Sequence, residues 1–77
     1  KMLFFDARLS RDNNISCASC HNPSFGWQVP FAKAIGAGGK PLARKSPTTI
    51  NHAWAGLLFW DGRASSLEDQ ARGPIQA

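Results

Sequence analysis

The pentapeptide Cys17-Ala18-Ser19-Cys20-His21 holds the residues of this chain with the clearest chemistry. It has the pattern Cys-x-x-Cys-His, in which each thiol can add across a vinyl group of haem while the histidine ligates the iron. Residues i and i+3 of a helical turn share a face, so both sulfurs can reach one edge of the porphyrin. The motif therefore predicts one covalent c-type haem, attached through Cys17 and Cys20, with His21 as the axial iron ligand.

Two other uses of the motif stay open. A thioredoxin-like redox pair has the same cysteine spacing, but it is expected in a βαβ context that this chain lacks. A zinc site needs four ligands, which the three motif residues and His52 could supply, although nothing else resembles a zinc-binding module. The chain has two cysteines in all, so a haem would leave none for a disulfide.

The length and composition fit a small domain built around such a group. A chain of 77 residues makes a single c-type haem domain, residues 1–77, and buries little surface by itself. Haem would add a large apolar element, around which three Trp and five Phe residues can pack. The formal net charge of +4 is scattered, so no nucleic-acid surface is expected. No apolar run approaches the roughly 20 residues of a membrane span.

Both ends of the chain read as the interior of a longer protein. Residues 1–5 look like the middle of an amphipathic segment, and residues 73–77 look like the start of a connection. No signal peptide is visible. Haem c is attached outside the bacterial cytoplasm, so we expect an exported, periplasmic protein from which the export signal has been removed.

The local patterns predict a mostly α, cytochrome c-like domain with short helices, long loops and no sheet around one haem. Ser16 is placed to cap the turn that carries the haem motif. Residues 22–46 combine clustered glycines with single apolar residues, which predicts a long loop wrapped over the cofactor. Ser46 and Pro47 form a helix start. The following helix would bury a stripe formed by Ile50, Ala53, Trp54 and Leu57.

The last part of the chain has a turn signal and a helix signal. Asp61-Gly62 marks a turn, within which Asp61 is expected to cap the backbone. Residues 65–68 form a capping box that would open a final helix through Arg72, and Gly73-Pro74 would stop it. His52 would point away from the buried stripe of the preceding helix, as a surface or loop-packing histidine.

Five segments form a pattern in sequence order: Leu3-Phe4-Phe5-Asp6-x-Arg8-Leu9-Ser10, Ser16-Cys17-Ala18-Ser19-Cys20-His21, Ser46-Pro47-Thr48, Phe59-Trp60-Asp61-Gly62-Arg63-Ala64 and Leu67-x-x-Gln70-Ala71-x-Gly73-Pro74. Together they resemble the N-terminal haem domain of bacterial di-haem cytochrome c peroxidases. The MauG-type enzymes, which oxidise tryptophan side chains of partner proteins, belong to the same superfamily. The resemblance covers nearly the whole chain. It implies a haem that reacts with hydrogen peroxide and receives electrons through a second haem domain or a redox partner protein.

The resemblance also implies roles for single residues. His21 matches the proximal ligand, and Trp60 matches a tryptophan that conducts electrons between the two haems. Gln70 and Pro74 match residues that line the peroxide pocket, and Arg63 matches a structural or propionate-binding arginine. Each also has a simpler interpretation: a core aromatic for Trp60, a helix-surface amide for Gln70, a helix stop for Pro74 and a solvated turn residue for Arg63.

Three departures from the family pattern bear on function. The catalytic glutamate of the family would lie a few residues beyond Pro74 and is absent from these 77 residues. Ala37 stands where relatives place a histidine that can cap the iron. Lys45 stands where an asparagine commonly helps to bind calcium between the domains, so no calcium is predicted. The first departure leaves two alternatives to a peroxidase domain: a non-enzymatic monohaem electron carrier, and a structural fragment with a vestigial haem.

Overall fold

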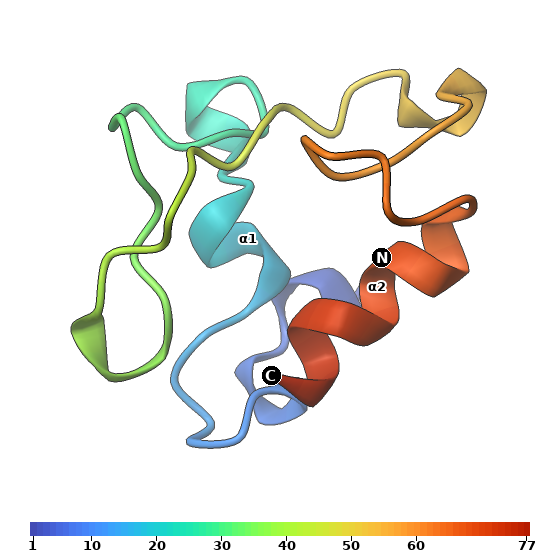
Figure 1. Ribbon diagram of the computed structural model, residues 1–77. Coiled ribbons are helices and arrows are strands. Elements are labelled where there is room, and N and C mark those ends of the chain that lie inside the picture. Colours follow the sequence, from blue (N-terminus) through green and yellow to red (C-terminus); the bar gives the residue numbers. More distant parts are fainter.

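Short helical turns joined by long loops make up the fold, in a computed structural model that describes all of residues 1–77 (Figure 1). The two α-helices are α1 (Cys17–Cys20) and α2 (Leu67–Gln76). The 3₁₀ turns are η1 (Leu3–Phe5), η2 (Ala7–Leu9), η3 (Pro23–Phe25), η4 (Ala37–Gly39) and η5 (His52–Trp54). No strand forms, and isolated antiparallel bridges join Asn22 to Gln28, Ile35 to Pro41 and Leu58 to Ala64. The expected small domain with long loops and no sheet is confirmed.

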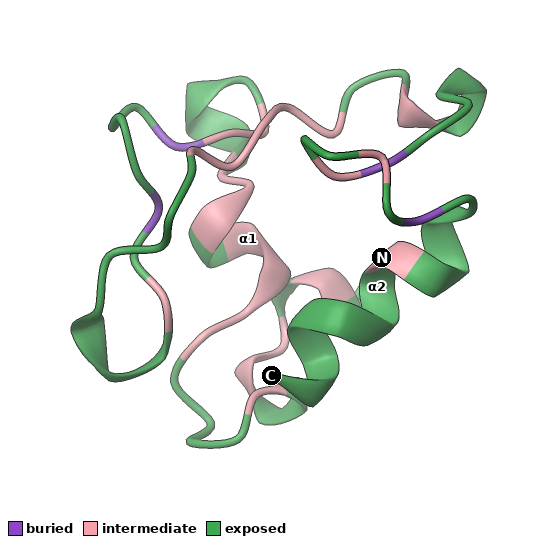
Figure 2. Ribbon diagram, viewed as in Figure 1, coloured by how far each residue is buried: buried purple, intermediate pink, exposed green.

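The protein core is very small. Only four residues are buried, namely Val29, Ala34, Leu58 and Ala64 (Figure 2). No large side chain is fully buried. Burial of apolar surface is the dominant favourable term in folding, so a core of this size calls for a further apolar group at its centre.

The aromatic residues of the N-terminal segment pack on the loop that follows α1. The ring of Trp27 makes edge-to-face contacts with Phe4 and Phe5, at centroid distances of 5.6 and 6.4 Å. The chain turns directly after Phe5 at Asp6, whose carboxylate accepts a hydrogen bond from the backbone N–H of Arg8. These contacts pack η1 against the segment that holds α1, and so help to fix the haem motif.

The predicted helix after Ser46 is wrong, because only the single turn η5 forms there. The Thr48 hydroxyl accepts the N–H of Ile50, a side-chain bond that competes with helical backbone bonds. Asn51 is left-handed (φ 62°), which ends any right-handed helix at that point. The expected buried stripe is therefore exposed: Ile50 is 53% accessible, Leu57 67% and Trp54 82%.

Helix α2 starts one residue later and ends four residues later than predicted. The hydroxyl of Ser66, not that of Ser65, accepts the N–H of Asp69 and caps the first turn. The helix then continues through Gly73 and Pro74 to Gln76. Proline removes one N–H donor from the helix, but in the last turn few bonds depend on it. Gly73, just before it, faces the Phe59 ring, since a Cβ at that position would lie 3.4 Å from the ring.

Candidate functional site

Helix α1 places both cysteines on one turn. Ser16 is extended, and its N–H donates to the hydroxyl of Ser19, which closes the start of the turn. The N–H of His21 donates to the carbonyl oxygen of Cys17 at 2.9 Å, which closes its end. The predicted position of Ser16 at the start of the helix is confirmed. Cys17 and Cys20 are both free and half-buried, as attachment to a group inside the domain requires.

The ring of His21 is oriented by two backbone carbonyl groups. Its Nδ1 lies 2.9 Å from the carbonyl oxygen of Pro47 and 3.3 Å from that of Trp27. A carbonyl oxygen only accepts hydrogen bonds, so Nδ1 carries the proton and the lone pair is on Nε2. A histidine that ligates a metal through Nε2 commonly donates its other N–H in this way. The structure therefore leaves Nε2 of His21 available to ligate a metal ion.

The two carbonyl groups are themselves held by local structure. Trp27 ends a tight turn in which its N–H donates to the carbonyl oxygen of Asn22 at 2.9 Å. The hydroxyl of Thr48 donates to the carbonyl oxygen of Gly26 at 2.7 Å, which ties the segment after Pro47 to the same turn. Sequence reasoning missed Pro47 and Thr48 as support for His21, because it placed both in a helix. The one signal in the sequence was that Pro47 and Thr48 both belong to the Ser46-Pro47-Thr48 segment of the family pattern.

The thiol of Cys20 lies under the loop that follows. Its Sγ is 3.8 Å from the carbonyl oxygen of Ile35. Burial raises the pKa of the Cys20 thiol, although a hydrogen bond with Ser46 acts in the opposite direction. A thioredoxin-type cysteine needs a lowered pKa to be reactive. The environment of Cys20 therefore does not support that alternative.

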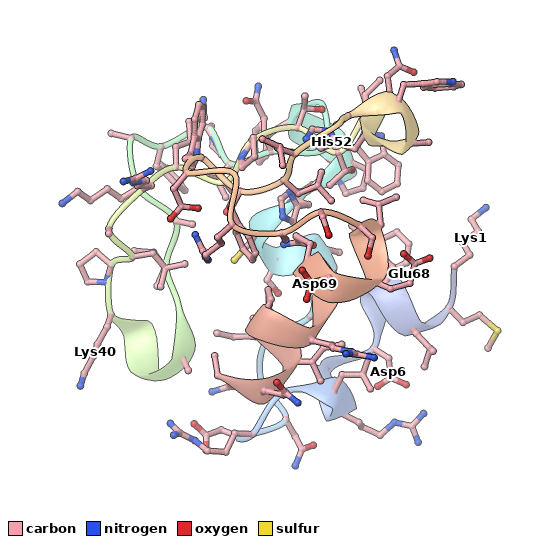
Figure 3. All side chains as sticks on the ribbon, turned by 45° about the vertical axis from the view of Figure 1, so that its right-hand side comes forward. Lys1, Asp6, Lys40, His52, Glu68 and Asp69 are labelled. Atoms are coloured by element: carbon pink, nitrogen blue, oxygen red, sulfur yellow. The ribbon has the colours of Figure 1, made fainter.

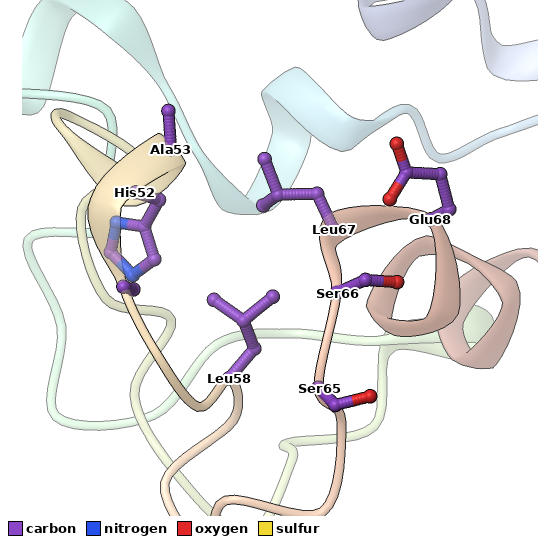
Figure 4. Close-up of a pocket in the computed structure, with 8 residues that line it drawn as sticks. His52, Ala53, Leu58, Ser65, Ser66, Leu67 and Glu68 are labelled. Atoms are coloured by element: carbon purple, nitrogen blue, oxygen red, sulfur yellow. The ribbon is translucent and has the colours of Figure 1, made fainter.

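The zinc alternative also lacks support in the arrangement of side chains. No three His, Cys, Asp or Glu side chains gather closely enough to hold a metal ion. His52 lies half-buried on η5, with its Nδ1 3.4 Å from the carbonyl oxygen of Ile50. Its ring lines a cavity of about 340 Å³ between η5 and the start of α2, together with Leu58 and Leu67 (Figure 4). This position fits the interpretation of His52 as a loop-packing histidine.

Cys17 and Cys20 of α1, together with the adjacent His21, have the chemistry that a covalent haem requires. Two thiols one turn apart and an imidazole with a free Nε2 are the groups that such a haem uses. The small protein core is consistent with a large apolar group completing the interior.

Pro74 and Arg63 meet at a second cavity, of about 530 Å³, beside Phe59. The Arg63 guanidinium lies 3.5 Å from the centre of the Phe59 ring, and its Nη1 is 2.7 Å from Oδ1 of Asp61. Asp61 also accepts the N–H of Arg63 at 3.4 Å, so its predicted role in the turn is confirmed. Arg63 thus belongs to the turn and at the same time faces the cavity with Pro74. Gln70 is half-buried on the same helix but lines neither cavity.

Trp60 stands apart from these groups. It is 61% exposed, and its indole N–H donates to the carbonyl oxygen of Lys45 at 2.8 Å. The interpretation of Trp60 as a buried core aromatic is therefore wrong. Its neighbour Phe59 adopts a left-handed backbone conformation (φ 63°), which is uncommon for a bulky residue and costs of order 1–3 kcal/mol.

Comparisons with known proteins give a consistent result. The whole chain, residues 1–77, matches the family described as di-haem cytochrome c peroxidase. It is 56% identical, over 100% of its length, to the methylamine utilization protein MauG of Methylorubrum extorquens. It is 46% identical, over 99% of its length, to a cytochrome c551 peroxidase of Pseudomonas aeruginosa. The chain spans 22% of the length of each of these relatives.

One solved structure extends this similarity to three dimensions. It is the crystal structure of a MauG-like protein associated with microbial copper homeostasis. The TM-score is 0.88 at 32% sequence identity, over 95% of this chain and 21% of that one. At this level of identity the similarity in fold agrees with the similarity in sequence.

Proposed function

Because the chain belongs to the di-haem cytochrome c peroxidase family, we propose that it is the haem domain at which hydrogen peroxide reacts in a longer, exported protein. Haem c, when bound, supplies the redox chemistry of peroxide reduction. In this proposal a second haem domain or a redox partner protein delivers the electrons. The periplasm is the proposed location, and neither helix has the length and apolar character that crossing a membrane requires.

The hydrogen bond from Nδ1 of His21 to the carbonyl oxygen of Pro47 carries this proposal. It fixes the tautomer and the orientation of the ring, and leaves Nε2 for the iron. Cys17 and Cys20 would hold the porphyrin through thioether bonds from the same helical turn. Cys17 and Cys20 lie on α1 and His21 follows it directly, so one short segment carries all three side chains.

Other residues have proposed roles around that centre. Pro74, inside α2, would line the side on which peroxide enters. The same role for Gln70, one turn before it, is supported by the resemblance to the family and not by the cavity, which Gln70 does not line. Arg63 would bind a propionate, because its guanidinium faces the cavity beside Pro74 and has one nitrogen committed to Asp61. Trp60 would conduct electrons, because its ring is held by a hydrogen bond and still reaches the surface.

Denaturing electrophoresis followed by a stain for haem peroxidase activity tests the covalent attachment. We expect a stained band for the native chain, no band for the double variant Cys17→Ala/Cys20→Ala, and a normal band for Ser19→Ala on the same helix. A haem that acidified organic solvent extracts from the native protein would contradict the proposal. Absorbance changes on adding peroxide then separate a peroxidase domain from an electron carrier, which would not respond.

A further inference from the structure

The loop formed by residues 31–45, called the basic loop below, holds four cations and no acid. These are Lys33, Lys40, Arg44 and Lys45. No Asp or Glu occurs anywhere between Asn13 and Trp60. The three ion pairs of the protein, Arg8–Asp6, Arg11–Asp12 and Arg63–Asp61, all lie outside the loop. None of the four cations of the loop is therefore in an ion pair with another residue of the chain.

Exposed apolar side chains lie among these charges. Phe31 is 63% accessible, Ile35 50% and Leu42 44%. The basic loop runs along the left side of the molecule in the view of Figure 1, and most of it is exposed (Figure 2). Leu42 faces inward from the loop, because it lines the cavity beside Arg63 and Pro74. Lys40 extends outward there, while Asp6 and Glu68 lie toward the opposite side (Figure 3). Apolar groups surrounded by charges of one sign are typical of a protein-binding surface.

The basic loop is also preformed. The N–H of Leu42 donates to the carbonyl oxygen of Ala34 at 2.7 Å, and the N–H of Gly36 donates to that of Lys40 at the same distance. Ala34 is completely buried and anchors the loop on the domain. Gly36 allows its two arms to approach, because a Cβ there would lie 2.6 Å from Cδ2 of Leu42. A partner would therefore meet an ordered surface, which lowers the entropic cost of binding.

We propose that the basic loop is a docking surface for a protein that presents a cluster of Asp and Glu side chains. Carboxylates would pair with Lys33, Lys40 and Arg44, and Phe31 would supply the apolar contact. The contact of Cys20 with the carbonyl group of Ile35 places this surface beside the haem motif. The inference goes beyond the proposed function, because it depends on charge and exposure and not on the haem.

Titration calorimetry of the haem-loaded protein with flavodoxin, a small acidic protein used as the probe, tests the proposal. The triple variant Lys33→Glu/Lys40→Glu/Arg44→Glu should weaken binding at low salt by about tenfold or more. The matched control Lys1→Glu/Arg11→Glu/Arg72→Glu makes the same change in net charge elsewhere and should weaken binding by no more than about twofold. Native binding should fall as salt is added, since salt screens exposed charges.

Three results would overturn the proposal: no binding of flavodoxin at low salt, equal losses in the two triple variants, or tighter binding to phosphatidylglycerol vesicles that only the loop variant loses. The last result would assign the loop to a membrane surface. If the triple variant does not fold, Lys40→Glu alone should still weaken binding by about twofold or more. If docking fails, the haem stain of the protein stays unchanged. If the haem is not attached, the salt-dependent binding of flavodoxin stays in place.

Discussion

The indole N–H of Trp60 donates a hydrogen bond to the carbonyl oxygen of Lys45 at 2.8 Å, and the ring nevertheless stays 61% exposed. Lys45 lies two residues before Pro47, whose carbonyl oxygen accepts the Nδ1 proton of His21. One short stretch of backbone therefore holds both the proposed iron ligand and the proposed electron conduit. A change that loosens this stretch should disturb both residues.

Replacement of Trp60 by Phe tests the first of these contacts. The variant keeps an aromatic ring but loses the hydrogen bond, which should lower the free energy of unfolding by about 1 kcal/mol. Urea unfolding of the haem-loaded protein measures this loss. The control Trp54→Phe changes a ring that is 82% exposed and makes no hydrogen bond, so it should change stability by less than about 0.5 kcal/mol. Peroxide turnover should fall in Trp60→Phe only, and equal effects of the two variants would contradict the proposed role of Trp60.

Replacement of Thr48 by Val tests the support of His21. The variant removes the hydroxyl that bonds to the carbonyl oxygen of Gly26 and to the N–H of Ile50. We expect a loss of about 1–2 kcal/mol in stability. We also expect a rise in the midpoint potential of the haem, because a weaker bond to Nδ1 makes His21 a less basic ligand. Potentiometric titration measures the second effect. Thr49→Val is the matched control, and an unchanged potential in Thr48→Val would disprove the link.

The haem motif, its capping serine and the turn at Asp61-Gly62 could be predicted from the sequence, because each depends on contacts within a few residues. The support of His21 could not, because it joins residues 26 positions apart through a backbone carbonyl group. Side-chain types carry no signal for such a contact. The Ser46-Pro47 helix start was wrong for a different reason, because the Thr48 hydroxyl and the left-handed Asn51 compete locally with helical bonds.

The spacing of Ile50, Trp54 and Leu57 matched a buried helical face, but in the structure these side chains are exposed. Periodicity records which residues are apolar and does not say what covers them. The end of α2 was misplaced because Gly73 and Pro74 are strong stop signals in isolation. In the structure the helix continues through both residues to Gln76, because a helix tolerates glycine at a cost of about 1 kcal/mol and a proline in the last turn removes few bonds.

The cap of α2 gives a comparison between adjacent serines. Ser66→Ala removes the hydroxyl that accepts the N–H of Asp69 and should lower the free energy of unfolding by about 1 kcal/mol. Ser65→Ala should have little effect, because the Ser65 hydroxyl makes no hydrogen bond to the helix. Thermal or urea unfolding distinguishes the two variants. A larger loss of stability in Ser65→Ala than in Ser66→Ala would show that Ser65 caps the helix, as the sequence predicted.

The pair formed by Asp61 and Arg63 makes stability depend on pH. The hydrogen bond from Arg63 lowers the pKa of Asp61 below its ordinary value of 3.8. A carboxyl group with a lowered pKa in the folded state stabilises the fold above pH 3.8, and this contribution is lost as the pH falls through the lowered pKa. The difference in unfolding free energy between the native protein and Asp61→Asn should therefore be constant at neutral pH and shrink in acid. A stability difference that grows in acid would contradict the lowered pKa of Asp61.

The final prediction concerns the second axial position of the haem iron. In the proposal His21 takes one position, and Ala37 stands where the resemblance to the family implies a histidine that can cap the iron. Met2 is 89% exposed near the start of the chain, and a lysine would first have to lose its proton, which is unfavourable at neutral pH. His52 is the remaining candidate, but it lies on η5 and lines the cavity toward the start of α2, beside Leu58. We therefore expect a ferric haem that is five-coordinate or water-bound and high-spin, and that reacts with peroxide without prior reduction.

Absorbance and electron paramagnetic resonance spectra of the ferric protein check this expectation directly. His52→Ala should leave the high-spin spectrum unchanged, because the ring is not a ligand. His21→Ala should abolish that spectrum, since it removes the proximal nitrogen. A low-spin spectrum in the native protein that becomes high-spin in His52→Ala would identify His52 as the second ligand. An iron with both axial positions taken by histidine would not react with peroxide. The electron-carrier alternative would then describe the chain better.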